Sequence, residues 1–181
     1  AVADADELNA LEHAIGESID RFVEFPLSRA DLDVLRGVEP AVVGAAYMRR
    51  TRPWYLRGGT HLIDKNPMNV FATPTILSSL PDAKVLCLVR DGMDACYSGL
   101  RQLFQNGAFA YSYDQRQLAE RYAGFRSVVE AMQARYPSNF LAVPYEALVA
   151  DPATTANQVM EFCGLRFDPA YLDITRNTMP S

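Results

Sequence analysis

The chain has 181 residues, of which 49% are hydrophobic, and its formal net charge is −5. This amount of apolar side chain is enough for one substantial core, so we expect a single globular domain over residues 1–181 and no disordered region. An acidic chain is not expected to bind nucleic acid in general. No apolar run approaches the roughly 18 residues of a membrane span. No charged-then-apolar leader opens the chain either, so the sequence predicts a soluble, cytoplasmic protein.

The chain has three cysteines, Cys87, Cys96 and Cys163. Their spacing offers neither a zinc site nor a disulfide framework, and an odd number leaves at least one thiol free. This use of cysteine fits a reducing compartment.

Apolar periodicity and capping signals predict a chain rich in helix. A proline is expected to end the first helix, and a Thr-Pro pair supplies the N-cap and first turn of the third expected segment. In the longest helix a single apolar stripe indicates packing against a core. The helices are expected over Asp6–Phe25, within residues 32–55, over Thr73–Leu80, from about Gly92, over Gln115–Tyr136 and from Pro152 to Gly164.

Three short apolar segments predict β-strands, at His61–Asp64, Ala83–Val89 and Phe140–Val143. The second of them, AKVLCLV, is apolar almost throughout, which is typical of a parallel strand buried on both faces. Strands that alternate with helices imply a parallel sheet with right-handed crossovers. The predicted fold class is therefore α/β, rich in helix, with a parallel sheet flanked by helices.

The residues that follow the second strand, VRDGMDACYS from Val89 to Ser98, predict a phosphate site. Asp91 is expected to cap the next helix, with Asp94 three residues later as the second member of a capping box. Arg90 at the end of the strand and Ser98 in the second helical turn could both reach one anion. The alternative is that Arg90 pairs with Asp91 or Asp94 and that Ser98 only permits close packing.

The pattern R-D-G-x-x-x-x-x-S after a hydrophobic strand closely resembles the 3′-phosphate-binding motif of sulfotransferases that use 3′-phosphoadenosine 5′-phosphosulfate (PAPS). The segment HLIDKNP, residues 61–67, resembles the D-K-x-P element of that family. The segments YEALV, DP and FCGL, within residues 145–165, resemble its usual ending. Order and spacing agree over this whole span, so the combined pattern is far more specific than any one motif. The bacterial branch that is also similar to tyrosylprotein sulfotransferases matches best.

The resemblance implies a P-loop-like fold and transfer of a sulfuryl group from PAPS to an acceptor hydroxyl or amine, without a metal. It implies that Arg90 and Ser98 bind the 3′-phosphate, that Lys65 contacts the sulfuryl group and that Tyr145 lies near the adenine. From the residues alone, Lys65 is alternatively a surface lysine paired with Asp64, and Tyr145 is equally well explained by core packing. The sequence does not identify the acceptor, which is a small molecule or a macromolecule.

Residues 5–8, ADEL, resemble the family's G-E-L element, whose glutamate is the base that takes the acceptor proton. An aspartate stands here in place of the glycine. Glu7 is the expected base, and a positioned carboxylate contributes roughly 10²- to 10⁴-fold in rate. Alternatively, Glu7 is a first-turn glutamate that interacts with the helix dipole, and Glu12, His13 and His61 are rival bases.

The family opens its domain with a strand and a P-R-S-G-T-like loop whose backbone amides hold the 5′-phosphosulfate. The sequence contains no such loop, and Gly58-Gly59-Thr60 predict only a turn. We therefore expect the chain to be the middle of a domain, truncated at both ends. A P-loop nucleotide kinase is one alternative, but it should contain a G-K-[ST] loop. A non-catalytic nucleotide-binding or interaction module is the other.

Two further segments bear on the acceptor. A basic stretch that ends at Lys65 is best explained as a solvated helix end, and alternatively as a rim that attracts an anionic acceptor or the phosphates of the donor. The other members of the basic stretch are Arg49, Arg50, Arg52 and Arg57. The aromatic segment 104–113 predicts a mobile loop over the site.

Overall fold

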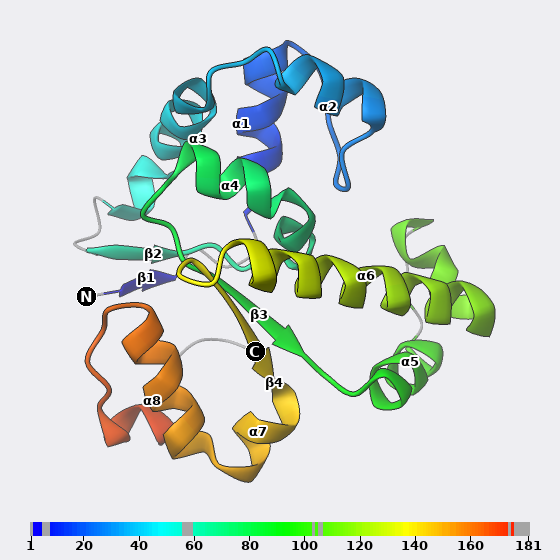
Figure 1. Cartoon of the computed structure of the whole chain (residues 1–181), viewed down its shortest axis with the longest axis vertical. Coiled ribbons are helices and arrows are strands. Elements are labelled where there is room, and N and C mark those ends of the chain that lie inside the picture. Colours follow the sequence, from blue (N-terminus) through cyan, green and yellow to red (C-terminus); the bar gives the residue numbers. More distant parts are fainter. Residues whose placement is uncertain are drawn as a thin grey trace. The chain divides into compact units, whose positions relative to one another are not determined.

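The computed structural model describes residues 2–4, 8–55, 60–102, 104, 107–173 and 175. The chain divides into two compact units, Ala1–Ala83 and Lys84–Ser181. Each unit contains one pair of parallel strands among many helices (Figure 1). This arrangement confirms the predicted α/β class and its richness in helix. The single domain and the P-loop-like connectivity stay predictions.

The core of the first unit lies between α1 (Ala10–Ile19) and α3 (Pro40–Tyr55). Leu11 and Ile15 of α1 are buried at helical spacing and meet Val43 and Tyr47 of α3 in one apolar cluster. Around this core lie β1 (Val2–Asp4), α2 (Arg29–Leu35), β2 (His61–Ile63), the 3₁₀ helix η1 (Pro67–Ala72) and α4 (Thr73–Ser79). Strands β1 and β2 pair in parallel, with Val2 opposite His61.

The predicted helix over Asp6–Phe25 is too long at its carboxyl end, because α1 stops at Ile19. Asp20 adopts a left-handed conformation with φ 53°, and the Arg21 N–H donates to the Gly16 carbonyl at 2.9 Å. This is the geometry of a helix C-cap, in which aspartate is one of the few tolerated residues other than glycine. The predicted start at Asp6 lies outside the described residues.

The expected N-cap at Thr73 is also wrong by one residue. Thr73 is the first residue of α4, and the preceding position carries no side-chain cap. The Thr73 hydroxyl donates instead to the Val70 carbonyl of η1, at 2.8 Å. Because η1 runs directly into α4, the first helical N–H groups face a preceding helical turn and not an open chain.

Gly44 of α3 allows a close approach to α4. A Cβ at this position would collide with the backbone carbonyl oxygen of Ser79. We expect Gly44→Ala to lower the free energy of unfolding by about 1–3 kcal/mol, since overpacking outweighs the gain in helix propensity. Gly124 in α6 (Gln115–Arg135) is the matched control, because a Cβ there meets nothing within 4 Å.

In the control, Gly124→Ala is expected to raise the free energy of unfolding by about 0.5–1 kcal/mol through helix propensity alone. Urea titrations of both variants followed by circular dichroism measure the two effects. Stabilisation by Gly44→Ala would contradict the close packing of α3 on α4.

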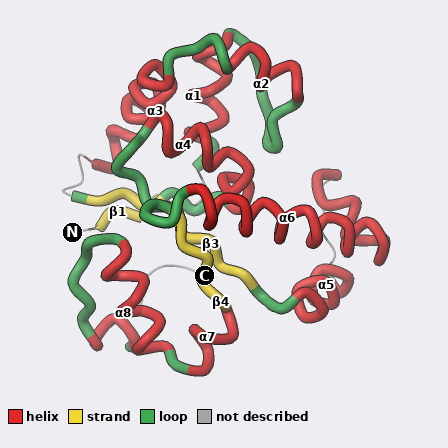
Figure 2. The backbone as a smooth tube through the Cα atoms, viewed as in Figure 1, coloured by secondary structure: helices red, strands yellow, loops and turns green. Residues whose placement is uncertain are grey.

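The second unit is organised by the parallel pair β3 (Val85–Val89) and β4 (Phe140–Pro144). Val85 lies opposite Phe140, and the register runs without a break to Val89 opposite Pro144. Figure 2 shows the two strands side by side, with a helix beginning where β4 ends. The helices are α5 (Gly92–Arg101), α6 (Gln115–Arg135), α7 (Tyr145–Ala150) and α8 (Pro152–Phe162), with 3₁₀ turns η2 (Gly107–Tyr113) and η3 (Pro169–Leu172). The segment expected to be a loop thus contains the 3₁₀ turn η2.

Strand β3 is buried on one face only, which corrects the expectation of burial on both. Cys87 and Val89 are buried, whereas Leu86 and Leu88 on the opposite face are 44% and 54% exposed. Successive side chains of a strand point to opposite faces, so the described chain covers only the Cys87 face. An apolar run alone does not reveal how many faces are covered.

The buried thiol of Cys87 makes stability depend on pH. Burial raises the pKa of Cys87 to about 11, whereas an unfolded cysteine titrates near pH ~8.5. Between these values the unfolded chain releases the proton first, so the free energy of unfolding falls as pH rises. We expect urea titrations to show that the free energy of unfolding decreases less between pH 7 and pH ~9.5 in Cys87→Ala than in the wild type. Equal losses would contradict burial of the thiol.

Candidate functional site

The candidate site begins where β3 ends and α5 starts. Asp91 is the N-cap of α5, and its Oδ1 accepts hydrogen bonds from the N–H groups of Met93 at 2.9 Å and Asp94 at 3.1 Å. These bonds satisfy two of the N–H groups that a helix start leaves without partners. The predicted helix start and cap are therefore confirmed.

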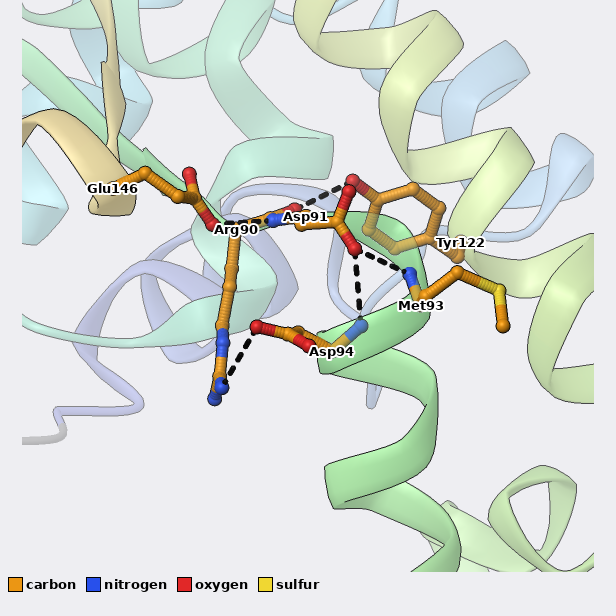
Figure 3. A network of polar contacts seen from close by, with 6 residues as sticks. All are labelled: Arg90, Asp91, Met93, Asp94, Tyr122 and Glu146. Atoms are coloured by element: carbon orange, nitrogen blue, oxygen red, sulfur yellow. Dashed lines mark hydrogen bonds and ion pairs between the residues drawn. The ribbon is translucent and has the colours of Figure 1, made fainter.

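The second half of the predicted capping box is wrong. The Asp91 N–H donates to Oε1 of Glu146 at 2.8 Å, so the carboxylate that closes the cap comes from α7 and not from Asp94. Asp94 instead faces Arg90, with 3.4 Å between its Oδ2 and the Arg90 Nη2. Figure 3 shows the Arg90 side chain extending along the first turn of α5 toward Asp94.

Arg90 contacts both a carboxylate and an aromatic ring. Besides the ion pair with Asp94, its guanidinium carbon lies 5.2 Å from the centre of the Tyr145 ring. The side chains of Arg90 and Asp94 are 42% and 62% exposed, and ion pairs this exposed contribute only about 0–1 kcal/mol. The pairing that was the alternative to a phosphate site is thus present, but it is weak.

Ser98 is exposed in the second turn of α5, four residues after Asp94. Residues four apart share one face of a helix, so Ser98 lies on the side of α5 toward which Arg90 extends. The structure brings Arg90, Tyr145 and this face of α5 together in the second unit. The role of Ser98 stays a prediction.

Tyr122, which sequence reasoning did not assign to the site, supports the junction from α6. The hydroxyl of Tyr122 donates to the carbonyl oxygen of Arg90 at 2.6 Å. Gly92 makes room for this tyrosine, because a Cβ there would lie 2.8 Å from the ring atom Cε1. Tyr122 belongs to the apolar stripe that the sequence predicts to pack against a core in the longest helix. No local signal distinguishes it from the other residues of that stripe.

Lys65 belongs to the first unit, two residues after the end of β2, and both of its neighbours in the chain are held by hydrogen bonds. Asp64 accepts from the Tyr47 hydroxyl at 3.0 Å and from the Asn69 amide at 3.4 Å. Burial raises the pKa of Asp64, although both hydrogen bonds act in the opposite direction. Asn66 accepts from the Met68 N–H at 2.9 Å and caps η1. The exposed Lys65 side chain therefore projects from a backbone segment whose two neighbouring residues are held by hydrogen bonds.

The candidate bases are less well defined. Glu7 lies outside the described residues. Glu12 accepts a hydrogen bond from the Phe25 N–H at 3.2 Å, and it lines a hollow of about 390 Å³ together with the exposed His13. His61 is exposed, and its Nδ1 lies 3.0 Å from the Thr60 hydroxyl. None of these contacts assigns the role of base.

The basic stretch is partly neutralised within the first unit. Arg49 and Arg50 of α3 both bond to the carboxylate of Glu17 on α1, the latter at 2.7 Å. The hydrogen bond from Arg50 is the main cause that lowers the pKa of Glu17. These two arginines therefore link α1 to α3, whereas Arg57 lies outside the described residues.

All three cysteines are free thiols. Within the described residues, no group of three or more histidine, cysteine, aspartate or glutamate side chains is arranged to hold a metal ion. None of the described helices combines the length and apolar character needed to cross a membrane.

A strand that is followed directly by an arginine and then by a capped helix with a serine in its second turn defines an α/β protein with a candidate anion site at the strand end. A model of the sulfotransferase family matches residues 22–169. The match covers most of the chain, and the chain belongs to this family. Lys65, Arg90, Ser98 and Tyr145 lie inside the matched range, and Glu7 lies outside it.

The chain is also similar to an uncharacterized protein of Aquifex aeolicus (strain VF5), with 26% identity over 121 residues. The aligned residues are 66% of this chain and 16% of that protein. The chain therefore matches only a small part of that longer relative.

Proposed function

We propose that the protein transfers a sulfuryl group from PAPS to an acceptor hydroxyl or amine. Membership of the sulfotransferase family supports the reaction class. The observation that carries the choice of donor is the junction of β3 and α5, where Arg90 extends toward Asp94 (Figure 3). Ser98 follows Asp94 by four residues and so belongs to the same helix face. A phosphate on the 3′-hydroxyl of adenosine is the group that distinguishes PAPS from ATP, and it suits this pair of side chains.

In this proposal the 3′-phosphate is held by side chains and not by helix amides. Two N–H groups in the first turn of α5, those of Met93 and Asp94, already donate to Asp91. The guanidinium of Arg90 offers five N–H donors in a planar fork, and the Ser98 hydroxyl adds one more donor. The positive end of the helix dipole favours the same anion.

The ion pair of Arg90 with Asp94 has to yield to the phosphate. Because both side chains are largely exposed, this costs little. The Tyr145 ring also contacts the guanidinium and limits its movement. We propose that the free face of Tyr145 flanks the adenine.

The transfer itself is a single in-line displacement. The acceptor oxygen or nitrogen forms a bond to sulfur while the bond from sulfur to the bridging oxygen breaks, and 3′-phosphoadenosine 5′-phosphate (PAP) leaves. Lys65 is proposed to stabilise the negative charge that grows on the bridging oxygen. Glu7 is proposed to take the proton that the acceptor loses.

Calorimetry with PAP and ADP on the full-length protein tests the donor assignment. The two nucleotides share the adenosine and a 5′-phosphate, and PAP alone offers a 3′-phosphate to Arg90 and Ser98. We expect PAP to bind at least about 10-fold more tightly than ADP, since one charge-assisted hydrogen bond contributes this much. Equal affinities would overturn the proposed donor. Transfer of labelled sulfate from PAPS to a panel of hydroxyl and amine acceptors then tests the reaction.

A further inference from the structure

We propose that Glu146 is a positioning residue, which together with Tyr122 clamps the peptide group between Arg90 and Asp91 and so aims Arg90 at the 3′-phosphate. This inference rests on the proposed function. It concerns a residue that does not contact the donor itself.

The clamp begins with the register of the two parallel strands. The ladder ends with Val89 opposite Pro144. The next positions in the same register are Arg90 and Tyr145, whose side chains are in contact. The position after that joins Asp91 to Glu146 by a hydrogen bond of 2.8 Å. Side chains at the start of α7 thus continue the strand pairing beyond the end of the sheet.

The two hydrogen bonds hold opposite ends of a single rigid group. The carbonyl of Arg90 and the N–H of Asp91 belong to the same peptide plane. The carbonyl accepts from Tyr122 of α6 at 2.6 Å, and the N–H donates to Glu146 of α7 at 2.8 Å. Figure 3 shows these partners approaching the plane from different elements. Rotation of the plane would break both bonds, so the direction in which the Arg90 side chain leaves the backbone is fixed.

A role through position and a role through charge predict opposite results. A carboxylate near a bound phosphate repels it, so removing the charge alone should tighten PAP binding. Glu146→Gln removes the charge but keeps an oxygen that can accept from the Asp91 N–H. Glu146→Ala removes both. Only a positioning role makes the alanine variant weaker than the glutamine variant.

Calorimetry on the full-length variants separates these possibilities. We expect Glu146→Ala to weaken PAP binding by about 3- to 10-fold, the effect of one net hydrogen bond, and to leave ADP binding unchanged. Glu146→Gln is expected to bind PAP at least as tightly as the wild type. Glu130→Ala is the matched control, since Glu130 forms an exposed pair with Arg126 on α6, and it should change neither affinity.

Hydrogen exchange at the Asp91 amide tests the clamp without any ligand. Exchange should become faster in Glu146→Ala and stay near the wild-type rate in Glu146→Gln. Tyr122→Phe removes the other bond while keeping the ring, and it should also weaken PAP binding if Glu146→Ala fails to fold. Unchanged exchange in Glu146→Ala, or unchanged PAP affinity in both Glu146→Ala and Tyr122→Phe, would overturn this inference. Equal affinity of the wild type for PAP and ADP would instead overturn the proposed function on which it rests.

Discussion

Arg90→Ala is expected to weaken PAP binding by roughly 10- to 150-fold while ADP binding stays almost unchanged. The factor follows from the loss of a charge-assisted hydrogen bond, which costs about 1.5–3 kcal/mol. The loss is confined to PAP because only this nucleotide has a phosphate at the 3′ position. Calorimetry of the wild type and the variant with both nucleotides measures the difference directly.

Two companion variants make this prediction specific. Arg101→Ala removes the arginine at the far end of α5, whose guanidinium lies over the Tyr97 ring, and it should leave PAP binding unchanged. Asp94→Asn should tighten PAP binding by about 2- to 5-fold, because it removes a competing partner of Arg90 that is worth no more than about 1 kcal/mol. This gain should shrink at high salt, since the pair is exposed. A similar loss in Arg90→Ala and Arg101→Ala would point to general charge attraction and not to a built site.

Features that depend on a few neighbouring residues could be predicted from the sequence. The cap at Asp91, the long helix α6 and the left-handed Gly164 after α8 all follow from local signals, and the structure contains each of them. The parallel pairing of β3 with β4 follows from the long helical connection that separates them. The family resemblance is confirmed as well, because its motifs combine residue type with spacing.

Features that depend on distant partners could not be predicted. The bond from Asp91 to Glu146 joins residues 55 apart, and the bond from Tyr122 to Arg90 joins residues 32 apart. The capping-box pattern assigns the carboxylate at the Asp91 N–H to Asp94, because it considers only residues three positions ahead, whereas Glu146 of α7 supplies it. Likewise, the end of α1 at Asp20 depends on a chain reversal that apolar periodicity does not record.

The chain offers an unusually clean test of the proposed chemistry, because its sequence contains only two lysines, Lys65 and Lys84. Lys65→Ala is expected to lower kcat by about 10²- to 10³-fold, the loss measured when one donor to a developing negative charge is removed. PAP binding should weaken by less than about 10-fold, since PAP has no sulfuryl group and keeps its proposed 3′-phosphate contacts with Arg90 and Ser98. Steady-state rates with labelled PAPS and calorimetry with PAP separate the two effects.

The other lysine supplies the control, and its surroundings explain why it should behave differently. Lys84 donates to the Ser138 carbonyl at 2.6 Å and lies 5.2 Å from the centre of the Phe162 ring. Lys84→Ala should therefore affect the stability of the second unit and leave kcat unchanged. Lys65 instead follows an anchored Asp64 and precedes an anchored Asn66, so its ammonium is presented from a fixed backbone, as a group that acts on a transition state must be. If Lys65→Ala lowered kcat no more than Lys84→Ala does, the charge on the bridging oxygen would have to be stabilised by a residue other than Lys65.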